Sequence, residues 1–202
     1  MFNKIYHFIK KIVSISYLKS LVPYIIIAFI LFIVGAFAGY YFANLYPSRA
    51  QDLVSLLEKI YSPILKESKF SQVLFVFLKN GFTSFLAIVL GVLFGIFPFV
   101  VLINNGEILG MLANIVFRNH STFYFFVGIL PHGIIEIPCF LVSSAIGLKI
   151  GRTVIKKVLR KKEVSVVREL NYGLRFFLVL LVFFFIAAVI ETLITPGLLR
   201  IY

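Results

Sequence analysis

The sequence predicts an all-α membrane protein that folds as a five-span helical bundle. Hydrophobic residues make up 61% of its 202 residues and charged residues only 14%, whereas soluble domains are about 45–50% apolar and about 25% charged. The mean hydropathy of +1.04 and five long apolar runs indicate that a lipid bilayer surrounds most of the chain. The same composition excludes a disordered chain, and the single cysteine, Cys139, excludes a disulfide framework.

Each apolar run is long enough to cross a hydrocarbon layer of about 30 Å as a helix. Together they form a single membrane domain, residues 1–202, and they lie at about 22–43, 80–103, 108–131, 134–151 and 176–195. The third run is interrupted by the polar residues 118–122. We therefore expect the third span to be broken at these residues. The sequence leaves open whether residues 118–122 form a loop, a broken helix or a re-entrant hairpin.

The basic residues indicate how the bundle is oriented. Residues 1–19 carry four lysines and no acidic residue, and residues 149–175 carry nine basic and two acidic residues. Both segments should be cytoplasmic. The chain must then cross the membrane an even number of times between them, and this holds only if residues 108–131 form one crossing. The amino terminus is then inside and the carboxyl terminus outside. Residues 152–175 are expected to form a basic cytoplasmic loop with a helix at the lipid surface.

The net charge of +12 does not indicate a nucleic-acid partner, because the basic residues flank apolar runs instead of forming a solvated basic face. The expected partners are the lipid bilayer and unidentified membrane or cell-envelope proteins.

Residues 49–78, between the first two spans, show the spacing of interfacial amphipathic helices. Apolar residues recur at helical intervals and polar residues occupy the other positions; the first set is Leu53, Leu56, Leu57, Ile60 and Ile64. We expect these helices to lie along the outer membrane interface or to pack on a partner.

Glycine pairs one helical turn apart predict close helix packing. In a bilayer, helices associate through close contact instead of hydrophobic burial, so small residues mark the contact faces. The pairs are Gly35/Gly39, Gly91/Gly95, Gly106/Gly110 and Gly147/Gly151. A tight internal bundle is the favoured interpretation, and homodimerisation through Gly35 and Gly39 is the alternative.

His132 and Glu136 are the most informative polar residues inside the apolar runs. They follow Pro131, which suits the first turn of a helix, and their spacing of four residues places them on one helix face. A metal site would need a third ligand, which this segment lacks. We therefore favour a structural hydrogen-bonded pair within the bundle, with Asn80 close by and Glu191 at a similar depth, and we expect no metal and no cofactor.

The segment Asn105-Gly106-Glu107 contains an Asn-Gly turn signal and is expected to form the cytoplasmic hairpin between the second and third spans. Glu107 would then begin the third helix, where the helix dipole favours a carboxylate. Glu191 lies near the end of the fifth span and can also reach the interface by extending its side chain. No enzyme motif is present, so no catalytic residue is expected.

These motifs resemble the stage II sporulation protein M family. The resemblance covers about residues 20–195 and is carried by Asn80, by the segment 105–107, by the run Pro131-His132-Gly133-Ile134-Ile135-Glu136, and by Gly147. It implies an integral membrane protein of five to six spans without known catalytic residues. The founding member of that family acts as a membrane scaffold for peptidoglycan-remodelling enzymes.

The sequence therefore predicts a non-enzymatic multipass protein of the cell membrane that organises partner proteins. The alternative is a permease or channel-like transporter that uses the polar groups of the bundle. A transporter requires these groups to face a cavity, whereas a scaffold requires only that they be satisfied.

Overall fold

The computed structural model describes residues 15–159 and 165–200, and all regular structure within these ranges is helical. The elements are, in order, α2 (Ile15–Leu45), α3 (Pro47–Leu65), α4 (Lys69–Val89), the 3-10 turn η1 (Leu90–Val92), α5 (Ile96–Asn119), α6 (Thr122–Val158), α7 (Val166–Val189), the π-helical turn η2 (Ile190–Ile194) and α8 (Thr195–Leu199). Five of the described helical segments are long and apolar enough to cross a membrane, which confirms the predicted fold class.

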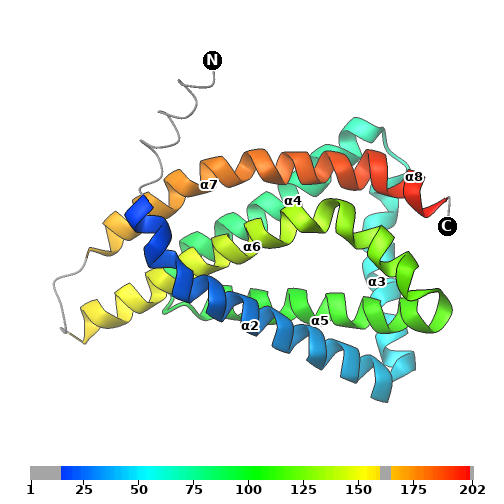
Figure 1. The fold of residues 1–202 in the computed structure, drawn as a ribbon, viewed down its shortest axis with the longest axis horizontal. Coiled ribbons are helices and arrows are strands. Elements are labelled where there is room, and N and C mark those ends of the chain that lie inside the picture. The colour runs from blue at the N-terminus through cyan, green and yellow to red at the C-terminus, as the bar shows by residue number, and fades with distance from the viewer. Residues whose placement is uncertain (1–14, 160–164, 201–202) are drawn as a thin grey trace.

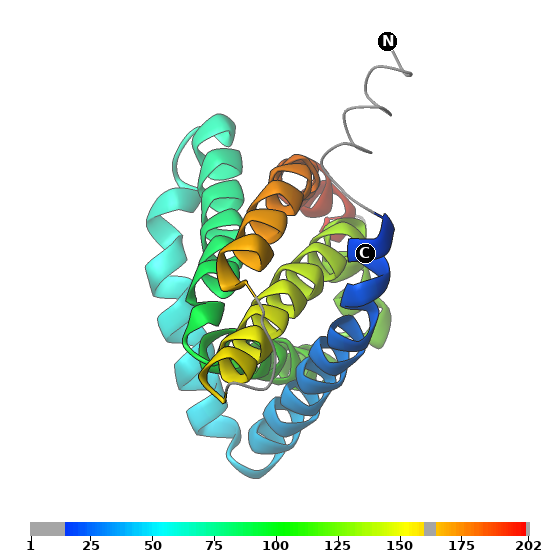
Figure 2. The same cartoon turned by 90° about the vertical axis from the view of Figure 1, so that its left-hand side faces the viewer.

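Helix α6 is the central element of the bundle. It contacts α2, α4, α5 and α7, and α2 packs along α5 (Figures 1 and 2). The helix α3 lies across one end of the bundle, on the same side as the turn between α5 and α6 and the helix α8 (Figure 1). We call this the α3 end. The start of α2, the end of α6 and the start of α7 lie at the opposite end, which we call the basic end.

The second and third spans lie at different residues than predicted. Helix α4 already begins at Lys69, so residues 70–78 belong to a span and only α3 is an amphipathic helix across the end of the bundle. The chain then turns at residues 93–95 instead of 104–107. Gly95 has φ +77° and precedes α5, and a positive φ at this position suits glycine.

The turn predicted at Asn105-Gly106-Glu107 is wrong, because this segment lies inside α5. The Asn105 side chain donates its Nδ2 hydrogen bond to the carbonyl of Val101 at 2.8 Å, so the amide is satisfied within the helix. Gly106 is buried against α2, which explains a glycine at this position without a turn. Glu107 lies in mid-helix and cannot act at a helix start.

The polar residues 118–122 form the turn between two separate spans, so the predicted break in the third span is wrong. Ser121 caps α6 by accepting a hydrogen bond from the backbone N–H of Tyr124 at 3.2 Å. Pro131 therefore lies inside α6 and does not begin the fourth helix. Membrane helices tolerate such a proline because neighbouring helices surround the freed backbone groups.

Two further boundaries differ from the sequence prediction. Helix α6 continues to Val158 and α7 begins at Val166, so much of the predicted loop 152–175 is helical; the middle of that loop, residues 160–164, lies outside the described residues. The last apolar helical segment extends to Leu199 instead of ending near residue 195. Pro196 lies at the start of α8, where a missing backbone donor is tolerated.

The glycine pairs lie where two helix backbones approach each other. A Cβ atom on Gly35 or Gly39 would collide with backbone atoms of α5, and one on Gly106 or Gly110 would collide with backbone atoms of α2. Gly147 and Gly151 of α6 face the chain around Gly91 and Gly95 in the same way. Gly35 and Gly39 are therefore buried inside the bundle, and a homodimer would have to use another surface.

Candidate functional site

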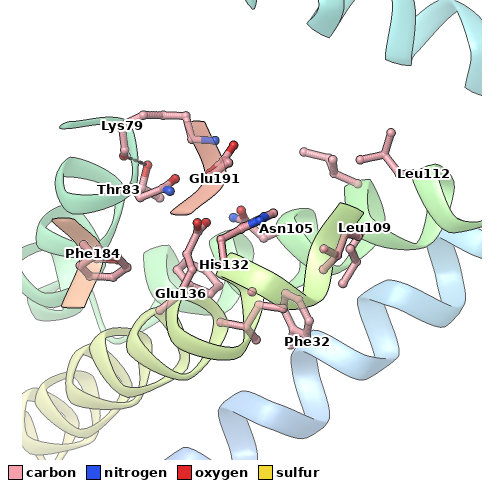
Figure 3. Close-up of a pocket in the computed structure, with 17 residues that line it drawn as sticks. Phe32, Lys79, Thr83, Asn105, Leu109, Leu112, His132, Glu136, Phe184 and Glu191 are labelled. Atoms are coloured by element: carbon pink, nitrogen blue, oxygen red, sulfur yellow. Dashed lines mark hydrogen bonds between the residues drawn. The ribbon is translucent and has the colours of Figure 1, made fainter. Parts of the chain in front are cut away.

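A cavity of about 250 Å³ opens between the spans (Figure 3). Its lining residues lie in the half of the bundle toward the α3 end. Apolar side chains from α2, α5, α6 and α7 form much of its wall, among them Phe32, Leu109, Phe140 and Phe184. Its polar lining comes from α4, α5, α6 and the π-helical turn η2, and consists of Lys79, Asn80, Thr83, Ser84, Asn105, His132, Glu136 and Glu191.

Helix α4 places Asn80 and Ser84 in the cavity wall because residues four apart share one helix face. Asn80 is 8% exposed and Ser84 is fully buried. The Asn80 Nδ2 and the Ser84 Oγ have no hydrogen-bond partner in the described part of the chain. A buried polar atom without a partner is costly, so this wall is suited to a polar ligand.

Lys79 and Thr83 lie on the same side of α4. The Thr83 hydroxyl is satisfied because it donates to the carbonyl of Lys79 at 2.9 Å. The Lys79 Nζ lies 5.4 Å from the centroid of the Tyr61 ring on α3. This cation–π contact connects the cavity with the amphipathic helix.

The opposite wall brings three ionisable side chains together. His132 and Glu136 lie one turn apart on α6, and Glu191 approaches them from η2 (Figure 3). One ligand atom of each residue lies within 4.8 Å of the other two. A π-helical turn is rare and is frequently found at functional sites, and here it carries one member of the cluster.

The hydrogen-bonded pair predicted for His132 and Glu136 is not formed within the described residues. The His132 Nδ1 and the Glu136 Oε2 are buried and have no hydrogen-bond partner there. The two side chains face one cavity together with Asn80, as expected, but they do not satisfy each other. His132, Glu136 and Glu191 therefore converge without hydrogen bonds to one another. Each can donate an electron pair to a cation.

The residues singled out from the sequence fall into three groups. Six of them line the cavity: Asn80, Asn105, His132, Gly133, Glu136 and Glu191. Gly106 packs against α2 instead, and Glu107 does not line the cavity. The glycines Gly35, Gly39, Gly91, Gly95, Gly147 and Gly151 lie at helix contacts.

Sequence reasoning missed Lys79, Thr83 and Ser84 of the cavity wall. A signal was available, because Thr83 follows Lys79 by four residues and Ser84 follows Asn80 by four residues. Two polar pairs at this spacing on an apolar helix indicate a polar face. Glu191 is the third member of the ionisable cluster. The direction of its side chain depends on the local widening of the helix at η2, which sequence spacing does not reveal.

Comparison with known proteins identifies a matching family and a partly aligned relative. The family model of stage II sporulation protein M matches residues 28–196. The chain is also 37% identical over 114 residues to a protein of Methanocaldococcus jannaschii that is described as uncharacterized. This alignment covers 55% of the chain and 64% of that relative, so the chain spans slightly less than two thirds of its length. No solved structure matches the chain.

The family match extends from the first span to the start of α8 and includes every residue that lines the cavity. The chain belongs to the stage II sporulation protein M family.

Proposed function

We propose that this protein is a multipass protein of the cell membrane that acts, without catalysis, as a scaffold for partner proteins of the membrane or cell envelope. The proposed orientation has the basic end in the cytoplasm and the α3 end outside. It is supported by the basic residues gathered at the end of α6 and the start of α7, which are Lys149, Arg152, Lys156, Lys157, Arg168 and Arg175.

The observation that carries the scaffold proposal is the uncovered apolar face of α3. This helix buries only Ala50 and Val54 against the rest of the chain, whereas Leu56 is 53% exposed and Ile60 is 68% exposed. Neighbouring positions on the helix carry charge, as at Glu58. Such a face needs an apolar neighbour, and its place across the outside end of the bundle suits a partner helix at the outer interface.

Site-specific photo-crosslinking in native membranes tests this proposal. A photoreactive residue in place of Ile60 should yield a discrete adduct with another protein. Val182 of α7 is the matched control, because it is 59% exposed on a spanning helix and should yield lipid adducts. If Ile60 also yields lipid adducts alone, α3 rests on the membrane surface and the scaffold proposal fails.

The cavity supports a second candidate, a permease. Its unpartnered polar atoms suit a polar solute, and in the proposed orientation it lies in the outer half of the bundle. The basic half is closed by the close approach of Gly147 to Ala87 and Gly91, so transport would require these helices to separate.

Alternating access distinguishes the two candidates. With Cys139 replaced by alanine, a cysteine in place of Ser84 is labelled by an impermeant thiol reagent from both sides if the protein is a permease. A scaffold allows labelling from the outside alone or no labelling at all.

A further inference from the structure

We propose that His132, Glu136 and Glu191 bind a divalent transition-metal ion in the cavity. This inference goes beyond the scaffold proposal, because a scaffold needs no metal and a metal site is compatible with either candidate function. It depends on the geometry of the three side chains, on the buried polar atoms around them and on the balance of charge.

The geometry fits one ion. The imidazole nitrogen and the two carboxylate oxygens all lie within 4.8 Å of one another. Ligand atoms about 2.1 Å from a tetrahedral zinc ion are separated by about 3.4 Å. Side-chain movements that shift each ligand atom by about 1 Å therefore bring the three atoms to coordination distance. The bound ion then retains at least one position for water or another ligand.

A second observation points independently to an occupant. Ser84 is fully buried and Asn80 is 92% buried, given its exposure of 8%, and each has an unpartnered polar atom in the wall of this cavity. Metal-bound carboxylates are commonly held by hydrogen bonds from neighbouring side chains. The Ser84 hydroxyl and the Asn80 amide can donate such bonds to the carboxylate oxygens that do not contact the metal.

The charges favour a divalent cation. Two ionised carboxylates in an apolar bundle repel each other. A divalent ion offsets the charge of these two ligands while His132 stays neutral, which reduces the cost of burying them. Lys79 is the cation that competes for the same carboxylates. Lys79 lines the same cavity and its Nζ lies 5.4 Å from the centroid of the Tyr61 ring. The described residues contain no ion pair between Lys79 and either Glu136 or Glu191.

The donor set defines the class of metal. An imidazole with two carboxylates suits zinc, manganese or ferrous iron, whereas Cu(I) prefers sulfur ligands and calcium and magnesium prefer sites built from oxygen alone. Cys139 does not line this cavity, so no thiolate is available to it.

Titration calorimetry of the full-length protein, purified in detergent and stripped of metal with a chelator, tests the proposal with Zn²⁺ as the probe. We expect one ion per chain. The variants His132→Gln, Glu136→Gln and Glu191→Gln should each weaken the binding at least tenfold. Glu107→Gln and His120→Gln are matched controls, because neither residue lines the cavity, and both variants should bind like the unaltered chain.

A second measurement guards against variants that fold poorly. Zn²⁺ should raise the thermal unfolding midpoint of the unaltered protein and of Glu107→Gln, but not that of Glu191→Gln. Lys79→Met should bind Zn²⁺ more tightly, because it removes a positive charge from the cavity. Absence of Zn²⁺ binding, equal binding by the cavity variants and the controls, or loss of binding in Lys79→Met would overturn the proposal.

Discussion

The Nζ atom of Lys149 lies 2.8 Å from the Oε2 atom of Glu169, and this ion pair joins α6 to α7 at the basic end of the bundle. The same Nζ donates a hydrogen bond to the Ser20 hydroxyl at 2.9 Å and lies 4.1 Å from the centroid of the Tyr17 ring. The two charged side chains are 12% and 18% exposed. One ammonium group thus holds the ends of α2, α6 and α7 together.

Replacing Lys149 by methionine should lower the free energy of unfolding by about 1.5–3 kcal/mol, the usual value of hydrogen bonds to charged groups. Glu169 would then remain partly buried without its partner, so the double variant Lys149→Met, Glu169→Leu should recover part of the loss. Thermal unfolding in detergent measures this. Lys157→Met on the same helix is the control, because Lys157 is exposed and its loss should have little effect.

Replacing Gly147 by alanine should destabilise the bundle although alanine is the better helix former. The change gains about 0.5–1 kcal/mol in helix propensity, but the new Cβ would collide with the carbonyl oxygen of Ala87 and the ring of Pro98. Overpacking of this kind typically costs about 1–3 kcal/mol, and backbone atoms cannot move aside as a flexible side chain can. We expect a lower thermal unfolding midpoint.

Gly128→Ala is the matched control for that experiment, because Gly128 lies in the same helix. A Cβ there would meet only the Leu199 side chain, at 3.7 Å and 3.9 Å, which is ordinary contact. This variant should be unchanged or slightly more stable. Equal effects of the two substitutions would mean that α6 does not pack against α4 as described.

The fold class could be predicted from the sequence because hydropathy is a local property and each span is predominantly apolar over enough residues to cross a membrane. The positions of the turns could not be predicted from the same signals. Asn105-Gly106 is a turn signal in water, but in an apolar bundle the helix continues, since the Asn105 side chain bonds to its own helix and Gly106 is needed for contact with α2. The true turn was signalled by Gly95 with Pro98 close behind.

The candidate site could be predicted in part. The spacing of His132 and Glu136 placed them correctly on one face, because four residues nearly complete a helical turn. Glu191 was expected at a similar depth, but the direction of its side chain could not be predicted. That direction depends on the π-helical turn and on how α7 is rotated against α6. Rotation of one helix against another is set by tertiary packing, which a single sequence does not specify.

Cysteine labelling of intact cells tests the proposed orientation in a chain that carries Cys139→Ala. A cysteine in place of Lys66, in the turn between α3 and α4, should react with an impermeant thiol reagent added outside. A cysteine in place of Lys157, near the end of α6, should react only after the membrane is permeabilised. Both residues are exposed, so burial does not explain a difference, and the reverse pattern would invert the topology.

Replacing Ser84 by alanine should stabilise the metal-stripped protein. The Ser84 side chain is fully buried and its hydroxyl has no partner among the described residues, and an unsatisfied buried group costs about 1–3 kcal/mol. Alanine removes that cost and is also the better helix former. The thermal unfolding midpoint should therefore rise, and the further rise caused by Zn²⁺ should be smaller than in the unaltered chain.

Ser143→Ala provides the comparison, because Ser143 is equally buried but its hydroxyl donates to the carbonyl of Cys139 at 2.9 Å. Removing this satisfied bond should lower the free energy of unfolding by about 0.5–1.5 kcal/mol before the gain in helix propensity. The two serines are equally buried but differ in whether the hydroxyl is bonded. If both substitutions shift the unfolding midpoint in the same direction and by the same amount, the Ser84 hydroxyl is already satisfied and does not serve a ligand.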